Sequence, residues 1–460
     1  MAQHTLIFAP LFKKLASYRN LVLETAKLAY PITIGQLGLV LMGLIDTVML
    51  GRVGNDAMGA ASVGNAVSFL FMLIGVGAMY SVSTFTAIAD GEGKPWLSIP
   101  IFKSAIRVAL IFTVILFGIN LFFVEHFYLF KQSASVSAMG AEFLWIVNFS
   151  VPAMLLYNAG KQVLDGLGKT QISMYVTAVG VGLNILLNWI MIYGHWGCPA
   201  MGVAGSAWAT TIARTVMALL MLGWTWYHPY IKTLKQQAVS AVRYELSIIR
   251  TGLPIGFTFF FEMGAFTVAL IMCGWISEVH LAAHQIAINL ASVTYMIITG
   301  IAAGGNILVG NFYGARDRIG VRRAGFAALL LCIIVEGVFA LLLLIFNKQL
   351  PALYTHDTEV ITMASDLLFL AAFFQFSDGI QAVGAGVLRG IKDTRVPGII
   401  AFISYWVLMV PGAYWLCFPV GWGIQGIWFA FIVGLTFAAI WLIMRFFNKS
   451  EYYSLTFEDI

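Results

Sequence analysis

Charged residues are scarce in this sequence of 460 residues. Asp, Glu, Lys and Arg together make up 10% of the chain, hydrophobic residues make up 60%, and the mean hydropathy is +0.88. An ordinary soluble chain carries about 25% charged residues. So few charges cannot cover the surface of a soluble protein of this length. The sequence therefore predicts a membrane protein whose surface meets lipid.

Cysteine is also rare, and its spacing excludes the common cysteine-based sites. The four cysteines form no CxxC pair and no Cys/His metal spacing, so we interpret them as packing residues. The net charge of +5 comes from basic residues in short segments between apolar runs, which does not indicate a nucleic-acid partner. No nucleophile and base are grouped within the apolar segments, so we do not expect an enzyme.

Long apolar runs dominate the rest of the sequence. A helix needs about 20 mostly apolar residues to cross the hydrocarbon core of a bilayer. About twelve windows of that length occur, which predicts an all-α, polytopic membrane protein of about 12 transmembrane helices. The predicted spans are 24–50, 58–88, 100–124, 140–164, 172–195, 203–227, 248–275, 281–310, 322–346, 361–388, 398–418 and 423–446.

The Lys and Arg residues are distributed unevenly between the two sides of this topology. Most of the 26 fall on one side, including Lys13, Lys14, Lys161 and Lys169. Because basic connections stay in the cytoplasm, we expect both chain termini to be cytoplasmic.

Several local patterns recur at a nearly constant distance along the chain. Residues 163–170 recur as residues 387–394, and Pro31 and Pro254 lie 223 residues apart. Such regularity indicates two tandem six-helix halves. Because six is even, both halves insert with the same orientation, as a parallel repeat that places a cavity between two pseudo-symmetric bundles.

The repeat also predicts how the chain is divided. The division is a cytoplasmic N-terminus at 1–23, an N-terminal six-helix lobe at 24–227, a cytoplasmic linker at 228–247, a C-terminal six-helix lobe at 248–447 and a cytoplasmic C-terminus at 448–460.

Five charged residues lie deep within predicted spans: Asp46, Glu262, Asp378, Glu336 and Arg214. A charge at the centre of a bilayer costs at least about 2.5–3.5 kcal/mol on insertion scales, so each needs a partner or a function. We interpret Glu336 and Arg214 as members of structural ion pairs or hydrogen bonds. The other three are candidates for binding a cation or a proton, because none has an acidic counterpart in the other half.

Two asparagines in the fifth span add a second group of oxygen donors. Asn184 and Asn188 are four residues apart and share one helix face. Together with Asp46 and a hydroxyl such as that of Thr47, they would form an oxygen-rich site for sodium or for a protonation switch. Interhelical hydrogen bonding is the equally supported alternative.

The chain also resembles a known family, the multidrug and toxic compound extrusion (MATE) transporters, and most closely their bacterial NorM-like branch. The resemblance covers almost the whole chain. It rests on Pro31 with Gln36, on residues 46–51 (DTVMLG), on residues 281–287 (LAAHQIA) and on residues 386–395 (GVLRGIKDTR).

This resemblance implies a two-lobed secondary antiporter in the bacterial inner (cytoplasmic) membrane. Such a protein exports organic, mostly cationic and aromatic compounds in exchange for Na⁺ or H⁺, has no other cofactor, and works as a monomer in the lipid bilayer. It implies a cation-linked site at Glu262 and Asp378 and a polar cluster at Asp46, Asn184 and Asn188, with Na⁺ at one or the other. Four polar residues are expected to support these sites: Thr47, Gln36, Gln285 and Ser377.

Two other functions stay open on the residues alone. A flippase for a lipid-linked precursor would use the same two-lobed fold, but it would need several cationic residues in the cavity to hold phosphate, and only Arg214 qualifies. A channel or receptor without a transport cycle is the second alternative, which the duplicated halves disfavour.

Overall fold

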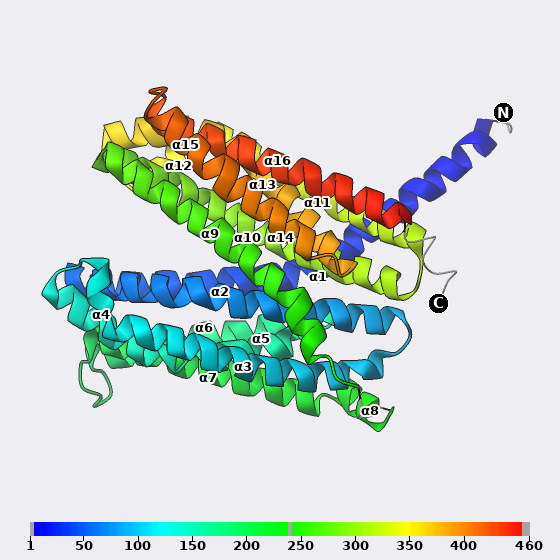
Figure 1. Ribbon diagram of the computed structural model, residues 1–460, viewed down its shortest axis with the longest axis horizontal. Coiled ribbons are helices and arrows are strands. Elements are labelled where there is room, and N and C mark those ends of the chain that lie inside the picture. The colour runs from blue at the N-terminus through cyan, green and yellow to red at the C-terminus, as the bar shows by residue number, and fades with distance from the viewer. Residues whose placement is uncertain (1–3, 238–241, 453–460) are drawn as a thin grey trace. The chain divides into compact units, whose positions relative to one another are not determined.

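The computed structural model describes residues 4–237 and 242–452, and it describes the side chains of residues 18–228, 231–236 and 242–451 (Figure 1). Within these residues every regular element is a helix. Parts of the predicted cytoplasmic segments, residues 1–3, 238–241 and 453–460, lie outside the described residues, as do the side chains of Lys13 and Lys14.

The helices match the predicted spans one for one. Eleven are long and apolar enough to cross a membrane, or twelve if one bent pair counts as a single span, which confirms the all-α prediction for the described residues. They are α1 (His4–Gly51), α2 (Asn55–Gly91), α3 (Ser98–Glu125), α4 (Ala134–Asn148) with α5 (Val151–Gly166), α6 (Thr170–Tyr193), α7 (Gly202–Tyr227), α9 (Glu245–Ile276), α10 (Glu278–Gly314), α11 (Arg318–Ile345), α13 (Thr358–Gly390), α14 (Arg395–Phe402) with α15 (Val410–Cys417), and α16 (Gly423–Tyr452).

The fourth predicted span is broken between α4 and α5, which meet at 42°. A proline occupies the first turn of α5, where it has no N–H to continue the ladder of α4. Asn148 closes the end of α4, because its Nδ2 donates to the Phe117 carbonyl at 3.1 Å and its Oδ1 accepts from Asn120 at 3.1 Å. The Asn148 side chain therefore has partners for both its amide groups at the break, whereas Asn120 Oδ1 has none among the described residues.

The eleventh span contains a second irregularity, the π-helix η3 (Ile403–Met409) between α14 and α15. It ends two residues before Pro411, which cannot donate a backbone hydrogen bond. π-Turns are rare and occur frequently at functional sites. Four short helices serve as connectors: η1 (Pro95–Leu97), η2 (Phe127–Phe130), α8 (Pro229–Gln237) and α12 (Gln349–Ala352).

By packing, the chain forms two compact units. Unit 2 is Ile34–Phe260, and unit 1 combines the described parts of Met1–Thr33 and Phe261–Ile460. Helices α1 and α9 each contribute to both units. The first part of α1 packs in unit 1 with the C-terminal half of the chain, and the first part of α9 packs in unit 2 with the N-terminal half. The lobe boundaries at 24–227 and 248–447 follow the sequence repeat, and they stay a prediction.

The repeat is visible as one contact that occurs once in each unit. In unit 2, a Cβ added to Gly77 of α2 would overlap the backbone of Gly256 in α9. In unit 1, a Cβ added to Gly300 of α10 would overlap the side chain of Thr33 in α1. Gly300 and Gly256 lie 223 residues after Gly77 and Thr33, the same distance that separates Pro31 from Pro254. Small residues thus let α2 approach α9 closely, and let the equivalent helices α10 and α1 do the same.

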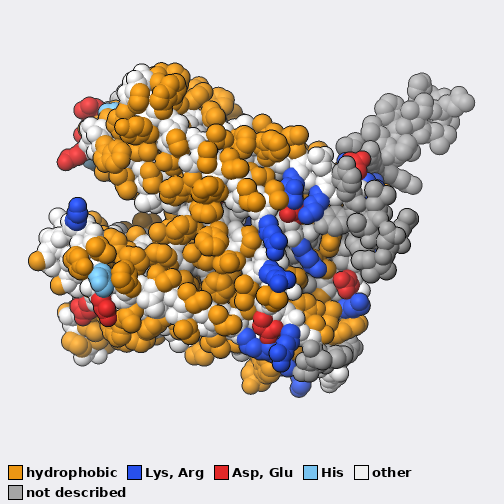
Figure 2. Space-filling model, in the orientation of Figure 1, with side chains coloured by type: hydrophobic (Ala, Val, Ile, Leu, Met, Phe, Trp, Pro, Cys, Tyr) orange, Lys and Arg blue, Asp and Glu red, His pale blue; other side chains and the backbone are white. Residues whose placement is uncertain are grey.

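The surface of each unit fits a lipid environment. Figure 2 shows hydrophobic side chains covering the sides of the helices, while Lys and Arg side chains of unit 2 gather at the end that carries α8. Val114 of α3 is 74% exposed and Leu219 of α7 is 65% exposed. Apolar side chains exposed over so large an area would be unfavourable in water. The chain is a multi-pass membrane protein.

Candidate functional site

The first polar cluster lies in unit 2 and joins α1, α6 and α7 around Asp46. One oxygen of the Asp46 carboxylate accepts from Asn188 Nδ2 at 2.5 Å, and the other accepts from Thr210 Oγ1 at 2.9 Å. The amide of Asn184 completes the ring, since its Nδ2 donates to Thr210 at 3.3 Å and its Oδ1 accepts from Asn188 at 3.2 Å. Asn184, Asn188 and Thr210 are buried.

The structure brings Asp46 and both asparagines together, as expected, but a different hydroxyl joins them. Thr47 donates to the Gly43 carbonyl of its own helix at 3.0 Å and does not join the cluster. Thr210 takes that place. The sequence offered no signal for Thr210, because threonines at helical spacing are common throughout the chain.

Arg214 lies one turn beyond Thr210 on α7 and faces the same cluster. Its guanidinium donates to Ser150 Oγ at 2.9 Å, and Asp46 is its electrostatic partner. The sequence interpretation of Arg214 as a structural hydrogen-bonding group therefore agrees with its contacts. Its charge balances that of Asp46 inside unit 2.

The second cluster lies in unit 1 around Glu262 and Asp378. Glu262 of α9 is 8% exposed and Asp378 of α13 is 6% exposed. Tyr295 of α10 donates its hydroxyl to Glu262 Oε1 at 2.5 Å, and the buried Tyr405 of η3 lies close enough to interact electrostatically with both acids. Asp378 Oδ1 has no hydrogen-bond partner among the described residues.

A hydrogen bond joins the π-helix η3 to α9 beside this cluster. Trp406 of η3 donates its indole N–H to the Phe261 carbonyl at 3.1 Å, one residue before Glu262. A π-turn changes the direction in which successive side chains point, which allows Tyr405 to face the acids while Trp406 contacts α9. Nothing in the sequence pattern indicated this turn.

Glu336 belongs to the same neighbourhood, and the sequence interpretation of it as a member of an ion pair or hydrogen bond finds no support. It is 1% exposed, its Oε2 has no hydrogen-bond partner among the described residues, and none of their ion pairs includes it. Asp378 interacts electrostatically with both Glu262 and Glu336. Unit 1 therefore holds three neighbouring buried carboxylates where the sequence predicted two.

The remaining predicted supporting residues are scattered. Gln36 donates to the Tyr80 hydroxyl at 2.8 Å within unit 2, away from the hydrogen bonds around Asp46. Ser377 is hydrogen-bonded to Thr436 of α16 at 2.7 Å. Gln285 is exposed on α10. Their role in the two sites stays a prediction.

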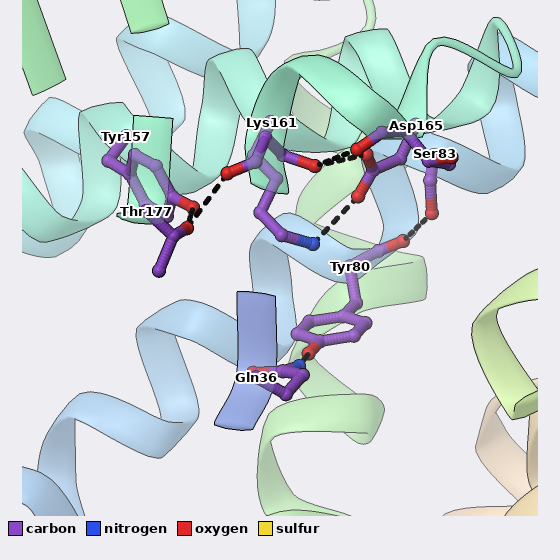
Figure 3. A network of polar contacts seen from close by, with 9 residues as sticks. Gln36, Tyr80, Ser83, Tyr157, Lys161, Asp165 and Thr177 are labelled. Carbon is purple, nitrogen blue, oxygen red and sulfur yellow. Dashed lines mark hydrogen bonds and ion pairs between the residues drawn. The ribbon is translucent and has the colours of Figure 1, made fainter. Parts of the chain in front are cut away.

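A third polar network, which the sequence analysis missed, lies in unit 2 (Figure 3). The Lys161 ammonium of α5 forms an ion pair with Asp165 Oδ2 at 2.7 Å, and both side chains are at most 5% exposed. Ser173 donates to the other Asp165 oxygen at 3.0 Å. Lys161 was counted with the cytoplasmic loop charges, which was wrong for its side chain. The i, i+4 spacing of Lys161 and Asp165 was the available signal.

Tyr80 connects this network to both helices that the two units share. Its hydroxyl accepts from Gln36 of α1, its ring packs edge-on against Phe259 of α9 with centroids 5.5 Å apart, and it interacts electrostatically with Lys161. Gln36 and Phe259 lie within three residues of the points where α1 and α9 pass from one unit to the other.

Neither acidic cluster resembles a transition-metal site. Among the described residues, no group of three or more His, Cys, Asp or Glu side chains is arranged to hold a metal ion. The donors present are carboxylate, amide and hydroxyl oxygens, the ligands that hard cations such as Na⁺ or a proton use.

Comparison with known proteins places the chain in a family. The MatE family model matches residues 31–190 and 254–415, two stretches that begin 223 residues apart. The chain belongs to the MATE family. Members of this family are membrane transporters and not enzymes, so the interpretation as a non-enzymatic transporter is confirmed.

Curated relatives place the chain in the bacterial NorM-like branch of the MATE family. The multidrug resistance protein NorM of Photobacterium profundum is 34% identical over 451 residues, covering 93% of this chain and 96% of the relative. The probable multidrug resistance protein NorM of Burkholderia pseudomallei is 33% identical over 442 residues, covering 93% of this chain and 92% of the relative.

Solved structures confirm the MATE fold. The crystal structure of a MATE P26A mutant superposes with a TM-score of 0.85 at 20% identity, covering 94% of this chain and 97% of that one. The eukaryotic MATE transporter AtDTX14 superposes with a TM-score of 0.86 at 14% identity, covering 95% of this chain and 98% of that one.

Proposed function

We propose that this MATE protein is a multidrug efflux antiporter that exports organic cations in exchange for Na⁺ or H⁺. The names of its NorM relatives support the multidrug activity. The buried carboxylates support cation coupling, because ionisable groups inside membrane bundles mark ion and proton pathways. We place the protein in the bacterial inner membrane with both termini in the cytoplasm, working as a monomer.

The observation that carries this proposal is the arrangement of Glu262 and Asp378. Both carboxylates are buried, they interact with each other electrostatically, and Asp378 Oδ1 lacks a hydrogen-bond partner among the described residues. Two adjacent buried negative charges repel each other in a low dielectric. A bound cation or proton relieves that repulsion, so the pair is suited to load and release one.

The Asp46 cluster has a different character. Each oxygen of the carboxylate already accepts one hydrogen bond, and Arg214 supplies a positive charge nearby. These contacts offset part of the cost of burying the Asp46 carboxylate. Only Asn188 Oδ1 is left without a partner in this ring. We assign the primary coupling role to Glu262 and Asp378, and to the Asp46 cluster a second role in holding α1, α6 and α7 together.

The cycle requires that the cation bind two conformations unequally. An ion that binds the drug-releasing state more tightly shifts the population toward that state, and by linkage the drug shifts it back. In this cycle the cation and the drug compete for the same carboxylates, so binding of one accompanies release of the other. No further cofactor is needed.

Everted membrane vesicles test this proposal. A sodium or proton gradient imposed across the vesicles should drive uptake of a fluorescent organic cation such as ethidium. Neutralising Glu262 and Asp378 together, as Gln and Asn, should abolish this gradient-driven uptake. The proposal fails if neither gradient drives uptake, or if the double variant transports like the unmodified protein.

A further inference from the structure

Glu336 is a buried acidic residue of unit 1 to which the family resemblance gives no role. It lies in the middle of α11 and is 1% exposed. Its neighbour across the helix interface is Gly379, the residue that follows Asp378 in α13. A Cβ added to Gly379 would lie 2.7 Å from Glu336 Oε1 and 3.0 Å from Cys332 Sγ. The missing side chain of Gly379 therefore creates the space into which the Glu336 carboxyl fits.

A second contact fixes this part of α11 against α13. Gln375 Nε2 donates to the backbone carbonyl of Glu336 at 3.1 Å, and its Oε1 accepts from Thr294 of α10 at 3.4 Å. Gln375 lies one helical turn before Gly379, so α13 holds both the backbone and the side chain of Glu336. The Glu336 carboxyl thus lies against α13 at Gly379, the residue that follows Asp378.

No cation neutralises Glu336 in the described part of the chain. Its Oε2 has no hydrogen-bond partner there, and none of the ion pairs found there includes it. An isolated buried carboxylate costs many kcal/mol, and such groups normally become neutral by holding a proton. Glu336 is therefore uncharged in this state.

The groups facing Glu336 are themselves acids. Asp378 of α13 interacts with it electrostatically, and Cys332 of α11 interacts electrostatically with both. Asp378 in turn interacts with Glu262 of α9 and with the hydroxyls of Tyr295 and Tyr405. Arg389, the cation of this region, acts on Glu262.

We propose that Glu336 is a third coupling carboxylate of unit 1, holding an exchangeable proton whose release depends on the charge of Asp378. Two observations carry this inference: the unpartnered oxygens of Glu336 and Asp378, and the gap at Gly379, the residue after Asp378, in which the Glu336 carboxyl lies. It rests on the proposed coupling role of Glu262 and Asp378. When a cation binds there and both acids ionise, the proton leaves to water. Without the cation, the negative charge of a neighbouring carboxylate keeps the proton on Glu336.

Proton counting on the purified full-length protein tests this role. In weak buffer with a pH-indicating dye, saturating NaCl or ethidium is added and the protons released per protein are measured over a range of pH. Glu336→Gln keeps the shape of the side chain and should release about one proton fewer at the pH of maximal release. The matched control Glu142→Gln, at an exposed carboxylate of α4, should release the same number as the unmodified protein.

A second variant keeps the test decisive if Glu336→Gln does not fold. Gly379→Ala retains every carboxyl, but its Cβ would displace the Glu336 carboxyl from its position against α13. It should shift the pH of half-maximal release by about one unit, the size of a typical interaction between close acids. A structural role alone would change stability and leave proton release as it was.

The outcomes separate the two proposals. If the unmodified protein shows gradient-driven uptake, but Glu336→Gln releases as many protons as the unmodified protein at every pH, Glu336 is not a coupling group and this inference is overturned. An unchanged release profile in Gly379→Ala also overturns it. If the unmodified protein shows no gradient-driven uptake, the proposed antiport itself fails.

Discussion

The buried ion pair between Lys161 and Asp165 allows a quantitative prediction about stability. The ammonium and carboxylate are 2.7 Å apart with side chains 5% and 3% exposed. At an effective dielectric of about 20, their attraction is about 6 kcal/mol, which largely offsets the cost of removing both from water. Removing one partner leaves the other charge buried and uncompensated, so Lys161→Met should cost about 3–5 kcal/mol of unfolding free energy.

The double variant separates this effect from simple loss of packing. Lys161→Met combined with Asp165→Asn removes both charges, and Asn can still accept the hydrogen bond from Ser173. It should therefore recover most of the stability lost in the single variant. Equilibrium unfolding in mixed detergent micelles measures both values.

An exposed pair provides the control for the same experiment. Lys94 and Glu92 are 3.3 Å apart, but their side chains are 54% and 39% exposed. Lys94→Met should change the unfolding free energy by no more than about 1 kcal/mol, as exposed pairs contribute little. The reasoning is refuted if Lys161→Met costs no more than Lys94→Met, or if the double variant is as unstable as the single one.

Three further perturbations follow from the contacts. Thr210→Val removes a donor to the Asp46 carboxylate and should cost about 1–3 kcal/mol of unfolding free energy in the same assay. Thr47→Val loses a hydrogen bond only to its own helix and should cost clearly less. Equal costs would contradict the role of Thr210 in the Asp46 cluster. Gly256→Ala should cost about 1–3 kcal/mol because its Cβ would overlap α2, and an unchanged midpoint would refute that close approach. Burial and then the Lys103 ammonium lower the pKa of Lys235 below its ordinary 10.5, so the folded state binds fewer protons there. The contribution of Lys235 to the unfolding free energy should therefore rise with pH up to about 10.5, and Lys103→Met should make that rise smaller. An unchanged dependence of the unfolding free energy on pH would rule out repulsion between Lys103 and Lys235.

Hydropathy and charge predicted most of the fold. All twelve predicted spans correspond to helices, because the length of an apolar run and the basic residues that follow it can be read from the sequence without knowledge of packing. The break between α4 and α5 and the π-helix η3 were not foreseen. Both lie next to a proline, and whether a proline kinks, breaks or merely begins a helix depends on which neighbours satisfy the freed backbone groups.

The candidate sites were predicted in part. Buried acids such as Asp46, Glu262 and Asp378 stand out because a charge in an apolar run is costly. Thr210 could not be found this way, because a hydroxyl in a membrane helix usually bonds to its own backbone. Glu336 was noticed and assigned to a structural bond. The packing of α11 against Gly379 and the electrostatic interaction with Asp378 show that it lies near another acid.

Transport by the purified protein in liposomes tests the central claim most directly. Uptake of ethidium is measured with a sodium gradient alone, with a proton gradient alone, and with neither, for the unmodified protein and for the Glu262→Gln, Asp378→Asn double variant. Antiport at these carboxylates predicts uptake that follows at least one gradient in the unmodified protein and neither gradient in the variant. Uptake that ignores both gradients, or that persists in the variant, would contradict it.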